Sequence, residues 1–140
     1  MLPPIAGTYI LFMQMHKPKS IQVGKLGEFM FRPGYYCYIG SAFGPGGLRA
    51  RVNRHILKNK KKKWHIDYIR EEVSLFKIWY SIKPIKLECS TVKHFNKIGC
   101  IFPVKGFGSS DCKCLSHLVQ LKSLPDLSQF KNYQSIDYSG

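Results

Sequence analysis

The first part of the chain alternates between short apolar runs and corners of glycine and proline. Residues 6–15 combine aromatic and β-branched side chains after a Pro-Pro pair, which is typical of a buried strand. Further apolar runs between turn residues predict strands over residues 21–23, 28–31 and 35–39. This part of the chain is therefore predicted to form a meander of short strands.

The periodicity becomes helical after a glycine-rich loop at residues 40–47. Leu48, Val52 and Ile56 recur every four residues, which is the spacing of one face of a helix. Later patterns predict a helix over residues 64–73, a strand over 75–80 and a helix over 88–98. The predicted fold class is α+β: a small, mainly antiparallel β-sheet flanked by helices.

The pattern indicates one domain over residues 1–124, followed by a polar C-terminal tail over residues 125–140 that we expect to be loose. A chain of 140 residues is long enough to bury a substantial core. No apolar run approaches the roughly 20 residues of a membrane-spanning helix, and the N-terminus lacks a basic leader. Five cysteines, an odd number, favour a reducing compartment over a disulfide framework. We therefore expect a cytoplasmic protein without a membrane partner.

The charge balance favours a polyanionic partner. The chain has 22 Lys and Arg against 8 Asp and Glu, which gives a formal net charge of +14. A positive potential of this kind attracts nucleic acid, because Lys and Arg release counterions from the phosphates. The candidate nucleic-acid contacts are Arg49, Arg54, Lys58, Lys60, Lys61, Lys62 and Lys63. We expect DNA as the partner, with RNA left open, and a solvated basic loop is the alternative.

Several short motifs, taken in order, resemble the GIY-YIG nuclease superfamily. The motifs are Gly7-Thr8-Tyr9, Tyr38-Ile39-Gly40, Arg51 on the following helix and Glu88 at the start of a later one. The sequences GYYCYIGSA (34–42), WHIDY (64–68) and FGSSDCKCLSHL (107–118) are closer still to an uncharacterised branch of small stand-alone or glycosylase-fused domains. Thr8 replaces the usual Ile. The resemblance implies a GIY-YIG-like sheet with an extra β-hairpin between the two tyrosine strands.

That resemblance implies a metal-dependent endonuclease, which hydrolyses phosphodiester bonds in DNA during repair or restriction. The implied roles are Glu88 as the single ligand of Mg²⁺ or Mn²⁺, Arg51 as the transition-state cation, Tyr9 as general base, Tyr38 as a positioning residue, and His55 and His65 as phosphate contacts or proton relays. No separate recognition domain is evident, so a partner protein is one possible source of specificity. The alternative is a non-catalytic nucleic-acid-binding module on the same fold, in which the tyrosines are ordinary sheet residues.

A cysteine and histidine cluster near the C-terminus allows a second chemistry. Cys112, Cys114 and His117 are zinc ligands by type. The fourth ligand would be Cys89, Cys100 or Asp111. Because Cys-x-Cys is less common than Cys-x-x-Cys in structural zinc sites, we favour apolar packing of the thiols over zinc. A structural, zinc-holding protein is thus a further alternative. The resemblance also implies that Ser110, Asp111 and His117 line the active cleft.

Overall fold

The computed structural model describes residues 2–109 and 112–138 of the chain. Its strands are β1 (Gly7–Met15), β2 (Lys19–Gln22), β3 (Glu28–Phe31), β4 (Gly34–Ala42), β5 (Ser74–Ser81), β6 (Cys100–Ile101), β7 (Leu118–Leu121) and β8 (Gln134–Asp137). Its α-helices are α1 (Gly47–Ile56), α2 (His65–Arg70) and α3 (Glu88–Ile98), with 3-10 turns η1 (Gly24–Leu26) and η2 (Leu127–Gln129). The strands predicted from the sequence are all present within a few residues.

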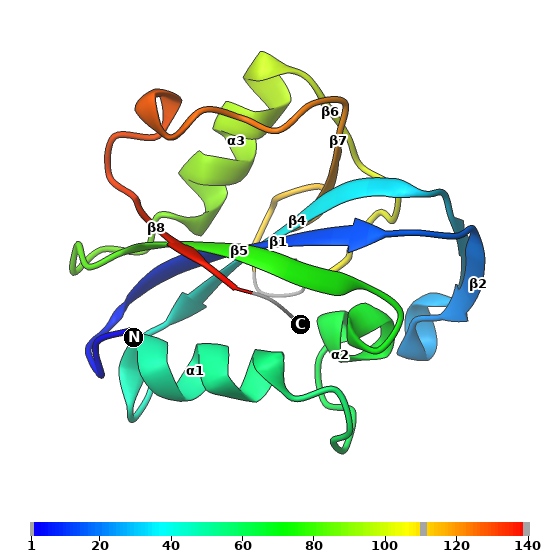
Figure 1. Cartoon of the computed structure of the whole chain (residues 1–140), viewed down its shortest axis with the longest axis horizontal. Coiled ribbons are helices and arrows are strands. Elements are labelled where there is room, and N and C mark those ends of the chain that lie inside the picture. The colour runs from blue at the N-terminus through cyan, green and yellow to red at the C-terminus, as the bar shows by residue number, and fades with distance from the viewer. Residues whose placement is uncertain (1, 110–111, 139–140) are drawn as a thin grey trace.

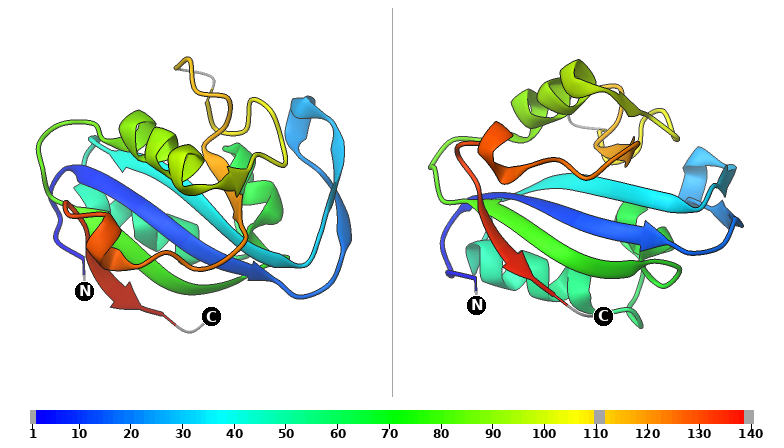
Figure 2. Two further views of the ribbon diagram at one scale, coloured as in Figure 1. Left: turned by 90° about the horizontal axis from the view of Figure 1, so that it is seen from above. Right: turned by 45° about the horizontal axis from the view of Figure 1, so that its top comes forward.

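Six strands form one antiparallel sheet in the order β6-β7-β4-β1-β5-β8. Helices α1 and α2 cover one face of this sheet and α3 covers the other (Figure 1 and Figure 2). The small α+β class with a mainly antiparallel sheet is thereby confirmed. The hairpin predicted between β1 and β4 is also present, as the separate two-stranded sheet β2-β3.

The central strand β1 is buried on both faces. Tyr9, Leu11 and Met13 pack towards α1 and α2, whereas Ile10 and Phe12 pack towards α3. Successive side chains of a strand point to opposite faces, so a strand covered on both sides needs apolar residues at every position. This is why residues 6–15 read as a continuous apolar run rather than as an alternating one.

The second helix is shorter than predicted. It ends at Arg70, and a turn at Glu71 and Glu72 leads into β5, where the sequence pattern predicted helix up to Val73. The Arg70 side chain is buried, and its guanidinium donates hydrogen bonds to the carbonyl oxygens of His55 and Ile56 at the end of α1. These bonds satisfy carbonyls that a helix end leaves unpaired, so Arg70 fixes α2 against α1.

The expectation of a loose tail after residue 124 is wrong for the described residues. β8 extends the sheet by pairing with β5, with Ile136 opposite Ile78. Phe130 and Tyr133 are buried, and the Tyr133 hydroxyl lies 2.7 Å from Thr91 Oγ1 on α3. The sequence pattern did not predict this strand, because the apolar residues of the C-terminal segment stand singly among polar ones. They are nevertheless enough to anchor an edge strand. Among the helices described, none is long and apolar enough to cross a membrane.

Candidate functional site

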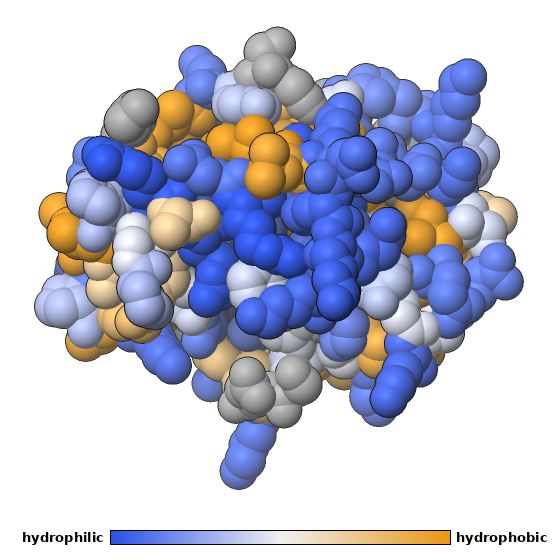
Figure 3. Space-filling model, turned by 90° about the horizontal axis from the view of Figure 1, so that it is seen from below, coloured by the Kyte–Doolittle hydropathy of each residue, from blue (hydrophilic) through white to orange (hydrophobic). Residues whose placement is uncertain are grey.

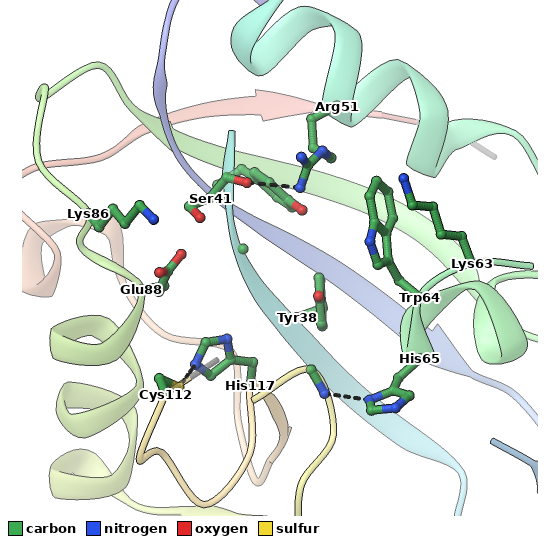
Figure 4. Close-up of a pocket in the computed structure, with 13 residues that line it drawn as sticks. Tyr38, Ser41, Arg51, Lys63, Trp64, His65, Lys86, Glu88, Cys112 and His117 are labelled. Carbon is green, nitrogen blue, oxygen red and sulfur yellow. Dashed lines mark hydrogen bonds between the residues drawn. The ribbon is translucent and has the colours of Figure 1, made fainter. Parts of the chain in front are cut away.

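A polar cleft of about 380 Å³ opens between α1, α2, the start of α3 and the loop before β7 (Figure 4). The structure brings seven of the predicted site residues to its walls: Tyr9, Tyr38, Arg51, Lys63, His65, Glu88 and His117. Side chains from segments far apart in the sequence therefore converge on one space. Of the other predicted site-lining residues, Ser110 and Asp111 lie outside the described residues.

The two tyrosines lie on neighbouring strands and share the same face of the sheet. Tyr9 on β1 is directly opposite Gly40 on β4, and Tyr38 is opposite Leu11. Their ring centroids are 6.4 Å apart. A Cβ at position 40 would collide with the Tyr9 ring and hydroxyl, so the glycine leaves the space that Tyr9 occupies. Sheet packing is therefore enough to account for the glycine of the Tyr-Ile-Gly motif.

Tyr9 is paired with a buried histidine from α1. The Tyr9 hydroxyl lies 2.7 Å from His55 Nε2, and His55 is only 1% exposed. Burial lowers the pKa of His55 to about 3, so the imidazole is neutral at physiological pH. His55 lies behind Tyr9 rather than on the cleft wall, which separates it from any bound phosphate.

Burial also governs the protonation of the tyrosines. It raises the pKa of Tyr9 well above its usual value, and the neighbouring Tyr38 raises it further. The pKa of Tyr38 is likewise raised, again mainly by burial. The Arg51 cation opposes both shifts without cancelling them. Both tyrosines therefore keep their protons at neutral pH, and Tyr9 can act as a base only if its own proton moves to another group.

Arg51 is held in the cleft by two contacts. Its Nη1 donates a 3.1 Å hydrogen bond to the carbonyl oxygen of Ser41, and its guanidinium lies 4.5 Å from the centre of the Trp64 ring. The guanidinium of Arg54 lies 4.1 Å from the same ring. A cation over an indole is attracted by the electron density of the ring face. Trp64 thus restricts where the Arg51 charge can lie (Figure 4).

Glu88 is the first residue of α3, and its carboxylate points into the cleft (Figure 4). The preceding Leu87 N–H donates a 3.2 Å hydrogen bond to Thr8 Oγ1, which is fully buried on β1. This bond joins residues 79 apart in the sequence and anchors the start of α3 to the central strand. Thr8 therefore has a structural role that an isoleucine at the same position could not perform.

The cations of residues 49–63, the basic segment, divide into those bound by other groups of the protein and those left exposed. Arg54 donates to both carboxylate oxygens of Asp67 at 3.1 and 2.9 Å, and Lys60 Nζ lies 3.7 Å from the same carboxylate. Burial alone would raise the pKa of Asp67, but hydrogen bonds from Arg54 and from the Trp64 and Lys63 backbone lower it below its usual value. Arg54 and Lys60 therefore bind Asp67 within the protein, whereas the sequence pattern predicted that both would contact nucleic acid.

The remaining cations of this segment are distributed over the surface that carries α1 and α2. Lys58, Lys61 and Lys62 are exposed, Lys63 reaches the cleft, and Arg49 Nε donates to the carbonyl oxygen of Leu2 at 2.9 Å. Figure 3 views the molecule from this side and shows hydrophilic side chains gathered across its centre. The exposed lysines thus lie on the same side of the molecule as the helices that border the cleft.

His65 and His117 both line the cleft but differ in their partners. His65 Nδ1 accepts a 2.8 Å hydrogen bond from the Gly108 N–H, which fastens the loop before β7 to α2. His117 Nε2 lies 3.2 Å from Cys112 Sγ and 4.0 Å from Cys89 Sγ. Burial lowers the pKa of both histidines. His65 is therefore a structural contact as well as a wall residue.

His117 belongs to a group of side chains that can hold a metal ion. The ligand atoms of Cys89, Cys112, Cys114 and His117 all lie within 4.8 Å of one another. All five cysteines of the chain are free. Burial and the neighbouring thiols raise the pKa of Cys114 to about 12, so this thiol stays protonated unless a cation stabilises the thiolate. The cluster forms one end of the cleft wall through Cys112 and His117.

Sequence reasoning missed three residues that line the cleft: Ser41, Trp64 and Lys86. Lys86 lies two positions before Glu88, in the exposed segment between β5 and α3. It adds a positive charge to the cleft wall that carries the negative charge of Glu88. Its proximity in sequence to Glu88 was the available signal. Trp64 was noted only as part of a motif, because a cation–π contact depends on the packing of α1 against α2.

Together these features define a small basic α+β domain with a polar cleft. Residues 8–136 match the family described as "Domain of unknown function DUF123", and the chain belongs to that family. No curated protein and no solved structure matches the chain. The identification with the GIY-YIG nuclease superfamily is therefore wrong, because the family matched over residues 8–136 is a separate one and nothing links the two. Short tyrosine and glycine motifs are not specific to that superfamily, because the packing of neighbouring strands also favours a glycine beside a tyrosine.

Proposed function

We propose that the cleft binds the phosphodiester backbone of nucleic acid and hydrolyses it, so that the protein is a metal-dependent endonuclease acting on DNA. The observation that carries this proposal is that Arg51, Lys63 and Lys86 line the same cleft as Glu88 and Tyr9. Phosphoryl chemistry needs cations for the phosphate oxygens and a group that orients the attacking water. The net charge of +14 supports the choice of a polyanionic substrate.

The residues divide the work according to their positions. Arg51 presents a planar fork of donors that fits two phosphate oxygens, and Trp64 and Ser41 keep that fork in place. Tyr9 would orient the attacking water through its hydroxyl oxygen, while its own proton is shared with the neutral His55 Nε2. The water oxygen bonds to phosphorus as the bond from phosphorus to the leaving oxygen breaks, and the proton that the water releases reaches that leaving oxygen through solvent. No step then requires Tyr9 to lose its proton, which agrees with its raised pKa.

The donor atoms of the cleft and those of the neighbouring Cys and His cluster suit different metal ions. Among the described residues that line the cleft, Glu88 is the one carboxylate, and a carboxylate with substrate oxygens suits Mg²⁺ or Mn²⁺. Such an ion supplies positive charge to the phosphate and lowers the pKa of its water. The thiols and imidazole of the neighbouring cluster suit zinc instead.

The raised tyrosine pKa values favour one second candidate. A cleft whose hydroxyls stay protonated is also suited to holding a phosphate by hydrogen bonds, without cleaving it. The alternative function is thus a non-catalytic nucleic-acid-binding module. For both candidates we infer DNA as the ligand and the cytoplasm as the compartment, with a partner protein as one source of sequence specificity.

The experiment that separates the candidates is a nicking assay on supercoiled plasmid, run with Mg²⁺ or Mn²⁺ and with EDTA. Glu88→Gln removes the carboxylate charge from the cleft, and Glu28→Gln is the matched control, an exposed carboxylate on the β2-β3 hairpin. Metal-dependent nicking by the wild type and by Glu28→Gln, lost in Glu88→Gln, supports the nuclease. Plasmid binding without nicking under either metal supports the binding module.

A further inference from the structure

Four side chains with metal-ligating atoms meet where α3 begins and the loop before β7 ends. Cys89 comes from the first turn of α3, whereas Cys112, Cys114 and His117 come from the loop. His117 Nε2 lies 3.2 Å from one thiol and 4.0 Å from another, and all four ligand atoms lie within 4.8 Å of one another. We infer that these four residues bind one Zn²⁺ ion and that this ion is structural.

The donor set determines the metal. Three sulfurs and one imidazole nitrogen match the Cys₃His type of structural zinc site, and thiolates are poor ligands for Mg²⁺, Mn²⁺ or Ca²⁺. Ligand atoms around a tetrahedral zinc ion lie roughly 3.3 to 3.8 Å apart, given bonds of about 2.0 to 2.3 Å. The observed separations need only a small contraction to reach these values. The four protein ligands also fill the coordination shell, which is typical of a structural site rather than a catalytic one.

Apolar packing does not account for the three thiols. Cys37 shows what a packing cysteine looks like in this chain, since it is fully buried within the apolar cluster under α3. Cys89, Cys112 and Cys114 are only partly buried, and none of them belongs to either apolar cluster. They face one another and His117 instead. A shared ligand explains why these polar contacts gather at one point of the surface.

The position of the cluster indicates what the ion stabilises. Residues 102–109 and 112–117 form no helix or strand, although backbone hydrogen bonds join parts of the segment, such as Gly106 N–H to the Leu115 carbonyl oxygen at 2.7 Å. Backbone bonds tie its end to the sheet, through Ile39 N–H to the His117 carbonyl oxygen at 3.0 Å. A zinc ion would add a direct link from the loop to α3. It would also fix the helical turn that carries Glu88. The importance of this for catalysis rests on the proposed function.

Metal content tests the site directly. The full chain is expressed with zinc in the medium, purified without chelator under reducing conditions, and its zinc content is measured by inductively coupled plasma mass spectrometry. We expect about one zinc ion per chain in the wild type. Cys114→Ser is expected to lose at least tenfold in occupancy, because serine removes one thiolate ligand. Cys100→Ser, which removes a partly buried thiol outside the cluster, is the matched control and should retain full zinc.

A second measurement keeps the test decisive if the variant does not fold. Wild-type protein stripped of metal is titrated with Co²⁺, whose visible absorption is intense in a tetrahedral thiolate site, and Zn²⁺ is then added to displace it. Tetrahedral cobalt bands that zinc abolishes support the site. The zinc site is overturned if the wild type takes up neither ion. It is also overturned if peptide mapping of protein purified under reducing conditions finds a disulfide between Cys89 and Cys112. Neither measurement uses nucleic acid, so the nuclease proposal can fail while the zinc site stands.

Discussion

The hydroxyl of Tyr9 lies 2.7 Å from Nε2 of His55, and both residues are 1% exposed. No partner is found within the described residues for the other ring nitrogen, His55 Nδ1. The Tyr9 contact is therefore the one described side-chain hydrogen bond of a buried imidazole. A pair of this kind is costly to break, because each partner has exchanged water for the other.

Tyr9→Phe is expected to destabilise the fold by about 1–3 kcal/mol, since it leaves a buried imidazole unsatisfied. The measurement is urea denaturation followed by circular dichroism. Tyr80→Phe is the control: its hydroxyl donates a 3.2 Å hydrogen bond to Gln134 at the exposed edge of the sheet. We expect that variant to stay within about 0.5 kcal/mol of wild type. Equal effects of the two substitutions would show that the Tyr9–His55 pair is not specially important.

His55 makes a pH dependence of stability predictable. Burial lowers its folded-state pKa to about 3 from 6.5, so the unfolded chain binds a proton at mildly acidic pH and the folded chain does not. This contribution to stability is complete above about pH 6.5 and is lost as the pH falls towards 3. Between pH 7.5 and pH 5 the free energy of unfolding should fall by roughly 2 kcal/mol from this group.

The measurement is a series of urea denaturation curves over that pH range, for the wild type and for His55→Gln. The variant keeps a polar group near Tyr9 but has no proton to gain, so its stability should change less between pH 7.5 and pH 5. His65, whose pKa burial also lowers, contributes in the same direction in both proteins. Parallel pH profiles of wild type and variant would contradict a buried, neutral His55.

Asp67 supports the segment that joins α1 to α2. Its fully buried carboxylate accepts hydrogen bonds from Arg54 and from the backbone N–H groups of Lys63 and Trp64, at 2.8 to 3.1 Å. Asp67→Asn should therefore cost about 3–5 kcal/mol, because a neutral amide cannot replace a charged acceptor of several donors. The exposed pair of Glu71 with Lys62, 3.9 Å apart, offers the control Glu71→Gln, with an expected change below about 1 kcal/mol. Thermal unfolding of the two variants gives the comparison.

How far the sequence predicted this fold depends on how local each signal was. The helix at residues 47–56 and the strand at residues 28–31 were predictable because their patterns lie within a few residues. β8 was not, because Gln134–Asp137 is mostly exposed and is a strand only by pairing with β5. The end of α2 at Arg70 was missed for a related reason, since the arginine caps another helix.

The site was predictable in part for the same reasons. Tyr9, Tyr38, Arg51 and Glu88 were singled out from motifs, and they do line one cleft. The family that those motifs suggested was nevertheless wrong, because tyrosines beside a glycine also satisfy the steric needs of paired strands. The Cys-x-Cys spacing alone did not favour a metal site. The fourth member of the cluster, Cys89, lies on α3, 28 residues before His117, so only the fold brings it to the other three.

Arg51 provides a sharp test of the cleft. Arg51→Ala should lower plasmid nicking by about 10²- to 10³-fold, the range for removing one transition-state donor, while circular dichroism stays unchanged. Arg49→Ala, two positions earlier on the same helix, removes an equal charge whose Nε is bound to the Leu2 carbonyl. We expect that variant to keep activity within about threefold of wild type. Full activity in folded Arg51→Ala would remove this residue from the proposed mechanism.

The exposed lysines of the basic segment should determine how nucleic-acid binding depends on salt. Lys58, Lys61 and Lys62 are exposed beside the helices that border the cleft, whereas Lys60 is held by Asp67 and the carbonyl oxygen of Arg54. Each lysine that neutralises a phosphate adds about 0.7 to 0.9 to the slope of log affinity against log salt. Replacing these three lysines with glutamine should therefore flatten the slope by about 2 to 3 if all of them bind phosphates.

The matched control replaces three other exposed lysines with glutamine and so changes the net charge by the same amount. Its positions are Lys97, Lys122 and Lys131, which belong to α3 and to the segments after β7 and η2. Fluorescence anisotropy with labelled duplex DNA at several salt concentrations measures both slopes. A general attraction by net charge would flatten both slopes equally. A defined binding surface would flatten only the slope of the first variant, because α3 and the segment between β7 and η2 lie on the opposite side of the sheet from α1 and α2 (Figure 1).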